Sequence, residues 1–197
     1  MNATSNFLFG TLIALIGPAN SQVMSWQGLG AVKLGMTVEE AQRALSAPLQ
    51  PKDAASSDEC WVTQRADGKD DAIYYRLQNG KISVITVWLN PRQQQSTAAA
   101  DTRGIGIGAT EADIRRAYGQ VNITFAPYFS AESEIEAAKE RARLGVKLSE
   151  PPPSPEYWVE VESPNHQRAI IFTTRDSKVV GLRAGFKPAV RDPEDCN

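Results

Sequence analysis

The chain carries one short pattern twice: residues 34–45 read LGMTVEEAQRAL, and residues 107–118, offset by 73 positions, read IGATEADIRRAY. Both copies place a glycine second, a threonine fourth, an acidic residue seventh and Arg-Ala at positions ten and eleven. A threonine followed three residues later by an acid is the pattern of a capping box, which satisfies free N–H groups in the first turn of a helix. The repetition indicates a chain made of two related halves.

Thr37 and Thr110 are therefore the predicted N-caps of two short helices, and Gly119 is a suitable residue to end the second one. The predicted helices cover residues 38–46 and 111–118.

A second similarity, at an offset of 97 positions, joins the segments that follow the helices. Residues 72–85 and 169–182 share Ala-Ile, an aromatic residue, Asn or Asp at a turn, and Lys followed by Ile or Val. At the same offset Trp61-Val62 matches Trp158-Val159. Asn79-Gly80 predicts a two-residue type I′ turn, because both positions of that turn need positive φ. The predicted strands of the first half are residues 60–65, 72–78 and 81–89.

Simple alternation about this turn puts the apolar residues from Ile73 to Val84 on one face of the hairpin. However, Ile85 and Leu182 are also apolar, and each lies three positions, rather than two, after the apolar residue that follows the turn lysine. Either each hairpin contains a β-bulge, or both faces of the sheet are partly covered. The sequence leaves both alternatives open.

The rise of the offset from 73 to 97 positions places 24 additional residues in the second half, within residues 122–155. Residues 131–144 have acids early and basic residues late, which favours an inserted helix. The resulting organisation is listed in chain order: residues 1–21, a signal peptide; residues 22–90, the first repeat, irregular up to residue 33; residues 91–103, a linker; residues 104–197, the second repeat with its insertion.

The N-terminal residues 7–17 form an apolar run of 11 residues, FLFGTLIALIG, which is too short to cross a bilayer. Pro18 and the small-x-small site Ala19-Asn20-Ser21 follow, as in a secretory signal that is cleaved before Gln22. A buried strand or a membrane anchor is the alternative. The pattern predicts a periplasmic or secreted protein with no stable membrane insertion after cleavage.

Cys60 and Cys196 are the two cysteines of the chain. In an exported protein they predict one disulfide bond, and the alternative is two unrelated buried thiols. Two cysteines do not supply enough ligands for a metal site. A net charge of −2 and a pI near 5.5 argue against a nucleic-acid partner, which requires a basic surface.

The order of these motifs, a capped helix after Gly-x-Thr and then antiparallel strands around an Asn/Asp turn followed by Lys-Ile/Val, resembles the β-lactamase-inhibitor-protein-like (BLIP-like) fold. A single copy is similar to the small lipoproteins of the outer-membrane β-barrel assembly machinery, although the lipid-acceptor cysteine of those proteins is absent. The resemblance covers residues 31–186. It implies an exported bacterial protein that packs helices on a sheet in each repeat and acts through protein contacts.

Exposed aromatic and arginine side chains on a sheet are typical of protein-binding hot spots. Tyr74 and Arg76 lie opposite the Tyr75 face in the simple register, whereas Trp88 lies on the Tyr75 face unless a bulge rotates it. The alternative for Tyr74 is packing beneath a helix or the other repeat. Tyr128 and Phe129, beside the insertion, are the second pair of candidate binding residues.

The residues that could suggest chemistry have simpler interpretations. His166, the single histidine, is predicted to be a solvated loop residue. Residues 104–109 match a loose dinucleotide-binding pattern but follow a polar segment, so turn glycines explain them. The acids of residues 67–71 surround a lysine and lack the spacing of a calcium loop. We predict no catalytic residue, no metal ligand and no cofactor.

Together these patterns predict an α+β protein of two tandem helix-plus-antiparallel-sheet repeats, the second with an inserted helix. The expected function is non-catalytic binding of another protein or an envelope component. A secreted hydrolase using carboxylates or Ser/Lys and a structural envelope protein without a dedicated partner are the alternatives.

Overall fold

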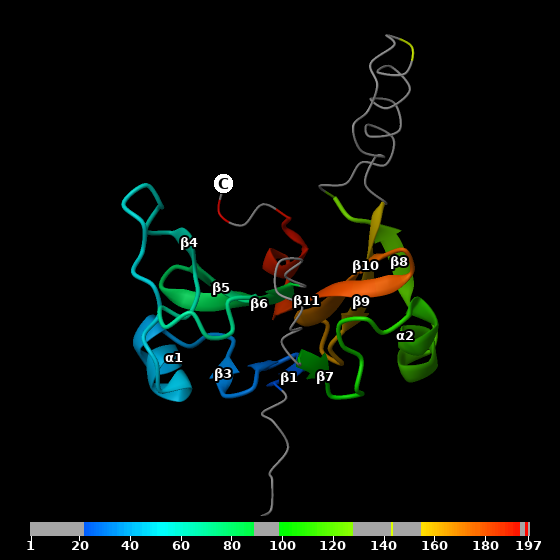
Figure 1. Cartoon of the computed structure of the whole chain (residues 1–197), viewed down its shortest axis with the longest axis horizontal. Helices are drawn as coiled ribbons and strands as arrows, with labels where there is room; N and C mark the ends of the chain where they lie inside the picture. Colours follow the sequence, from blue (N-terminus) through cyan, green and yellow to red (C-terminus); the bar gives the residue numbers. More distant parts are fainter. Residues whose placement is uncertain (1–21, 89–98, 128–142, 144–154, 194–195, 197) are drawn as a thin grey trace, which may run out of the picture.

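A long antiparallel sheet crosses the whole molecule in the computed structural model, which describes residues 22–88, 99–127, 143, 155–193 and 196 (Figure 1). Its strand order is β4-β5-β6-β11-β10-β9-β8. Its strands are β4 (Cys60–Thr63), β5 (Ile73–Gln78), β6 (Lys81–Trp88), β8 (Asn122–Phe125), β9 (Glu156–Glu162), β10 (Arg168–Arg175) and β11 (Lys178–Phe186).

Two α-helices and a small sheet pack together against one face of this long sheet. The helices are α1 (Val38–Leu45) and α2 (Glu111–Tyr118), and they lie at opposite ends of the molecule (Figure 1). The small sheet lies between them and consists of β1 (Gln22–Ser25), β2 (Gly28–Leu29), β3 (Val32–Lys33) and β7 (Ala99–Asp101). The described residues thus form a mixed α and β structure in which strands predominate.

Both helices begin as the sequence predicts. In α1 the N–H of Glu40 donates to Thr37 Oγ1 (3.3 Å), and the N–H of Thr37 donates to the Glu40 carboxylate (2.9 Å). Thr110 and Asp113 exchange the same two bonds at 3.0 and 3.2 Å. The helix α1 ends one residue earlier than predicted, because Ser46 adopts a left-handed conformation at the C-cap.

We expect Thr37→Ala and Thr110→Ala each to lower the free energy of unfolding by about 1 kcal/mol, because each leaves an N–H group of the first turn without its acceptor. Urea unfolding measures the change. The matched controls are the two Thr→Ser variants, which keep the hydroxyl and should stay close to the parent protein. A loss at one cap without a loss at the other would contradict the equivalence of the two helix starts.

The segment before each helix is joined to the long sheet by the same pair of backbone bonds. The N–H of Gly35 donates to the carbonyl of Ile82 (2.8 Å), and the N–H of Ile82 donates to the carbonyl of Met36 (2.8 Å). Val179 makes the corresponding 2.8 Å bonds to the two residues that precede Thr110. The spacing that both copies of the sequence pattern share therefore corresponds to the same backbone contact between the helix start and the long sheet in each half.

The hairpins of the two halves have matching turns and matching irregularities. Asn79 and Gly80 both have positive φ (50° and 73°), as a type I′ turn requires, and the equivalent Asp176 and Ser177 do as well. In each hairpin the register shifts by one residue. The extra residue is Ser83 in the first hairpin, and its equivalent at the offset of 97 positions in the second.

This bulge explains the positions of Ile85 and Leu182, which simple alternation does not. Ile85 pairs with Tyr75, and Leu182 pairs with Phe172, so both belong to the face that packs on the helices. Val84, by contrast, lies on the opposite face and not beside Ile73 as simple alternation predicts. Both alternatives hold, because residues of a second apolar cluster also cover part of that opposite face.

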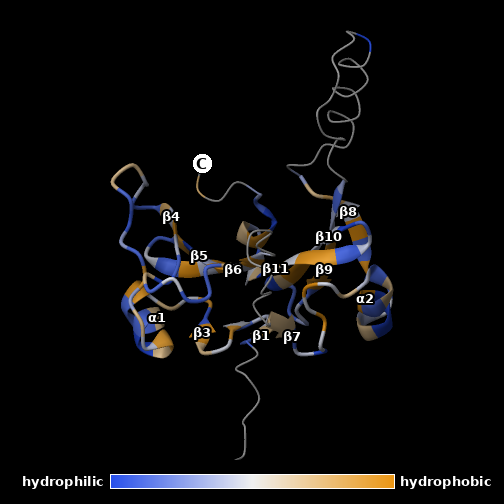
Figure 2. Ribbon diagram, viewed as in Figure 1, coloured by the Kyte–Doolittle hydropathy of each residue, from blue (hydrophilic) through white to orange (hydrophobic). Residues whose placement is uncertain are grey.

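We call the face that carries Tyr75 the inner face, and the face that carries Tyr74, Arg76, Thr86, Trp88 and Arg183 the outer face. The inner face holds the main core, which is continuous across both halves. Figure 2 shows hydrophobic residues along the long sheet in both halves of the molecule. The outer-face cluster consists of Val84, Ala126, Trp158, Ala169, Ile171, Ala189 and Val190.

The halves meet through β6 and β11, which pair antiparallel about a central pair, Thr86 and Arg183. These two residues are 97 positions apart, so each is the other's equivalent. The flanking pairs Trp88–Gly181 and Val84–Gly185 are also exchanged by the same offset. The register at this junction is therefore that of a local two-fold axis.

Three details of the predicted organisation are wrong. Residues 22–33 are not irregular but form β1 to β3, and the end of the predicted linker contains β7, which pairs in parallel with β1. Strands as short as these show no clear alternation of apolar and polar residues, and their pairing is non-local.

The third error concerns Trp61 and Trp158, which are not equivalent. The pairing of β9 with β10 is shifted by one residue relative to the pairing of β4 with β5. Trp61 therefore lies opposite Leu77 on the inner face, and Trp158 lies on the outer face.

Several predicted features lie outside the described residues. They are the signal peptide (residues 1–21), residues 91–98 of the linker and, apart from residue 143, the inserted helix (residues 131–144).

Candidate functional site

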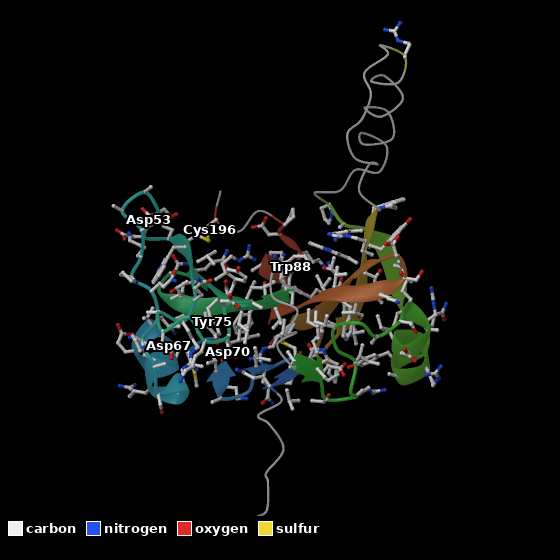
Figure 3. The ribbon with its side chains drawn as sticks, viewed as in Figure 1. Asp53, Asp67, Asp70, Tyr75, Trp88 and Cys196 are labelled. Atoms are coloured by element: carbon white, nitrogen blue, oxygen red, sulfur yellow. A yellow bond between two sulfur atoms is a disulfide. The ribbon has the colours of Figure 1, made fainter. Side chains whose placement is uncertain are left out.

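The bulge brings Tyr74 and Trp88 onto one face of the sheet. Tyr74 pairs with Thr86, and Trp88 lies two residues further along β6, so the two aromatic side chains are diagonal neighbours across the strands. Both are half-buried. Figure 3 shows Trp88 on the side of the sheet where the C-terminal segment runs, whereas Tyr75 points towards the helices.

Trp88 is held in place by a glycine on the neighbouring strand. Trp88 pairs with Gly181, and a Cβ atom at Gly181 would lie only 2.6 Å from ring atom Cε3 of the tryptophan. The ring therefore lies directly over the backbone of β11. This packing places the ring against β11 on the outer face, and tryptophan is among the residues enriched in binding hot spots.

Arg76 also lies on the outer face, but the prediction that it is exposed is wrong, because only 2% of it is exposed. Its guanidinium donates to the carbonyl of Ala189 and to the carboxylate of Asp192 (3.2 Å). Arg183, which the sequence did not single out, is 5% exposed and donates to the carbonyls of Val190 (3.4 Å) and Asp192 (2.8 Å).

These two arginines bind a segment that we call the C-terminal strap, residues 187–193, which contains the 3-10 turn η1 (Ala189–Arg191). The strap crosses the outer face over β6, β10 and β11, where Ala189 and Val190 pack in the outer-face cluster. Further along the chain, Cys196 is bonded to Cys60 at the start of β4, with an S–S distance of 2.06 Å and a Cα–Cα distance of 5.2 Å. The predicted disulfide is thus confirmed.

Acids of β9 bind two basic side chains of the strap, Arg191 and Lys187. Arg191 donates to both oxygens of Glu160 (3.0 and 3.1 Å from Nε) and to Glu162 (3.0 Å). Lys187 and the exposed His166 also contact the Glu162 carboxylate. Hydrogen bonds from Lys187, and then from His166, lower the pKa of Glu162 to about 2.

This shift predicts how stability depends on pH. The carboxyl of Glu162 holds its proton less well in the folded protein than in the unfolded chain, so its stabilising contribution is complete above about pH 4.5 and is lost as the pH falls towards 2. We expect Glu162→Gln to flatten the stability profile in this window, as measured by urea unfolding from pH 2 to pH 7. The control is Glu59→Gln, at an exposed position. Parallel profiles for Glu162→Gln and the parent would contradict the assignment.

A further aromatic surface lies at the edge strand β8. Phe125 is 52% exposed and stacks on Tyr157 with ring centres 4.8 Å apart. No sequence pattern singled out this pair, although the predicted binding residues Tyr128 and Phe129 follow closely in the chain. Those two candidates lie outside the described residues, so they stay predictions.

The acidic residues 67–71 and the glycines of residues 104–109 have structural roles. Arg65 binds Asp67 (2.6 Å) and approaches Asp70 (3.7 Å), at the lower left of Figure 3, and Gln22 donates to Asp70. In the loose dinucleotide pattern, Gly106 is required because a Cβ would lie 2.7 Å from the carbonyl of Ala99. No group of three or more His, Cys, Asp or Glu residues that could hold a metal ion is found among the described residues.

Two shallow hollows, of about 400 and 460 Å³, lie against α2 and α1 and not on the outer face. None of the described helices is long and apolar enough to span a membrane. Comparison of the chain with protein-family models, with curated proteins and with solved structures finds no match.

Proposed function

We propose that the protein is an exported, non-catalytic binding module whose partner is another protein or an envelope component, contacted through the outer face of the long sheet. The observation that carries this proposal is the aromatic pair Tyr74 and Trp88. The bulge turns both side chains to the same face, and Gly181 leaves the space in which the tryptophan ring packs on β11. Tryptophan and tyrosine are enriched among residues that dominate binding energy.

The fold that we propose for this module is the tandem BLIP-like arrangement of two repeats. Four observations support it: the paired capping boxes, the equal docking bonds at Ile82 and Val179, the bulges at equivalent positions, and the two-fold register of β6 and β11. Because β4 and β9 pair in different registers, the equivalent strands of the two halves are the hairpins β5-β6 and β10-β11.

Export is supported by two independent features. An apolar run of signal-peptide length precedes a small-x-small site, and the cysteines, which are distant in sequence, are paired. Both fit a periplasmic or secreted location.

A binding role is favoured over acid–base catalysis by the state of the acids at the outer face. Catalytic acids usually have pKa values moved towards neutrality, in sites that bury them without a full set of partners. The pKa of Glu162 is moved the other way, and Glu160 accepts three hydrogen bonds from Arg191. This arrangement is typical of a structural ion-pair network.

Chemical cross-linking and capture from envelope extract, with identification by mass spectrometry, tests the proposal. We expect the double variant Tyr74→Ala/Trp88→Ala to reduce capture of the specific partner by at least tenfold, because two hot-spot aromatics are removed. The matched control is Phe125→Ala, which removes an exposed aromatic from another edge. Equal capture by the double variant and the parent would refute the assignment of the outer face, provided that circular dichroism shows both to be folded.

A further inference from the structure

Backbone carbonyls of the strap accept hydrogen bonds from both buried arginines. Arg76 binds the carbonyl of Ala189, and Arg183 binds the carbonyls of Val190 and Asp192. Backbone carbonyls are present in every peptide, so these bonds do not depend on the strap's own side chains. The two guanidiniums thus form a row of donors on the outer face that fits the backbone of an extended or turned peptide.

Three side chains of the strap add selectivity. Val190 is fully buried in the outer-face cluster. A Cβ atom added at Gly185 would lie 3.0 Å from the Cβ of Val190, so the close approach of the strap depends on the glycine. The next residue, Arg191, is placed between two acids of β9, and the carboxylate of Asp192 lies 3.2 Å from Arg76. The pattern that the surface reads is therefore aliphatic, basic, acidic.

The strap is tied at both ends. It follows β11 directly, and beyond it Cys196 is bonded to Cys60 on the edge strand β4. While that bond is intact, a competing peptide must displace a segment that is covalently held in place at each side. Reduction leaves a single attachment, and the strap then competes as an intramolecular ligand with an effective concentration in the millimolar range.

We propose that the outer face is a peptide-binding groove in which the chain's own strap is seated, and that a partner segment with the pattern aliphatic–basic–acidic replaces the strap after a dithiol reduces the Cys60–Cys196 bond. In this step the dithiol gives two electrons and two protons, becomes a disulfide itself, and leaves Cys60 and Cys196 as thiols. The inference rests on the proposed binding function and names the chemistry of the partner.

The test uses the full exported chain, residues 22–197, and a fluorescein-labelled peptide of the strap sequence, KPAVRDP. Fluorescence anisotropy measures binding to Val190→Asp protein, whose own strap is weakened, before and after reduction with dithiothreitol. We expect binding to be at least tenfold tighter to the reduced protein, and a peptide with aspartate in place of the valine to lose binding at least tenfold. Equal binding in both redox states, or no binding in either, overturns the proposal.

Hydrogen–deuterium exchange on the unsubstituted chain gives a second readout that does not rely on a variant. We expect reduction to speed exchange of the strap amides of Arg191 and Asp192 at least tenfold more than exchange of the amides of β6 and β11, which rises only with the lower global stability of the reduced protein. A strap that stays protected, or one whose exchange rises no more than that of the sheet, shows that the strap opens only with the core and overturns the inference. Partner capture that depends on Tyr74 and Trp88 is measured separately, so a failure of the groove is distinguishable from a failure of the proposed function.

Discussion

The Cys60→Ser variant is expected to unfold with a free energy up to about 5 kcal/mol lower than that of the parent protein. The two cysteines are separated by 136 residues, and in the chain-entropy model a bond that closes so long a loop restricts the unfolded chain strongly. Denaturation in guanidinium chloride under non-reducing conditions measures the change.

Loss of either cysteine removes the same bond, which provides the controls. Cys196→Ser and the double variant Cys60→Ser/Cys196→Ser should both match Cys60→Ser, and the parent protein treated with reductant should approach the same value. A difference of less than 1 kcal/mol between the parent and all three variants would mean that the bond does not hold the tail to β4 in solution.

Phe172→Ala is expected to lower the free energy of unfolding by about 3–5 kcal/mol, because it opens a cavity in the core shared by both halves. Phe172 is fully buried, pairs with Leu182 and lies 6.1 Å from the ring of Tyr118. Thermal and urea unfolding measure the effect. Phe125→Ala removes the same side chain from an exposed position and should change the free energy by about 1 kcal/mol or less. A similar loss in both variants would place the core elsewhere.

The parts of the fold that could be predicted from the sequence are those that local chemistry decides. A threonine and an acid three residues apart define the start of each helix, and Asn79-Gly80 defines a turn, because these features depend on neighbours along the chain. The short strands β1 and β7 could not be predicted, since they pair with each other across more than seventy positions.

The same distinction explains the partial success at the outer face. Tyr74 and Trp88 were recognised by residue type, but their common orientation depends on the bulge at Ser83, which the spacing of Ile82 and Ile85 indicated only as one of two alternatives. The burial of Arg76 depends on the strap, which arrives from the far end of the chain. An arginine within a strand of mostly apolar residues was the available signal, because a guanidinium that becomes buried there needs acceptors from elsewhere.

The register between β6 and β11 restricts which residues the junction tolerates. Thr86 and Arg183 face each other at its centre, so this is the position where a residue of one half meets the residue 97 positions away in the other. Two arginines there would set like charges side by side, and identical bulky residues at the flanking pairs would compete for the space that Gly181 and Gly185 leave open. Identical residues are therefore disfavoured at this seam, which is consistent with the match between the two sequence patterns stopping at Ile85 and Leu182.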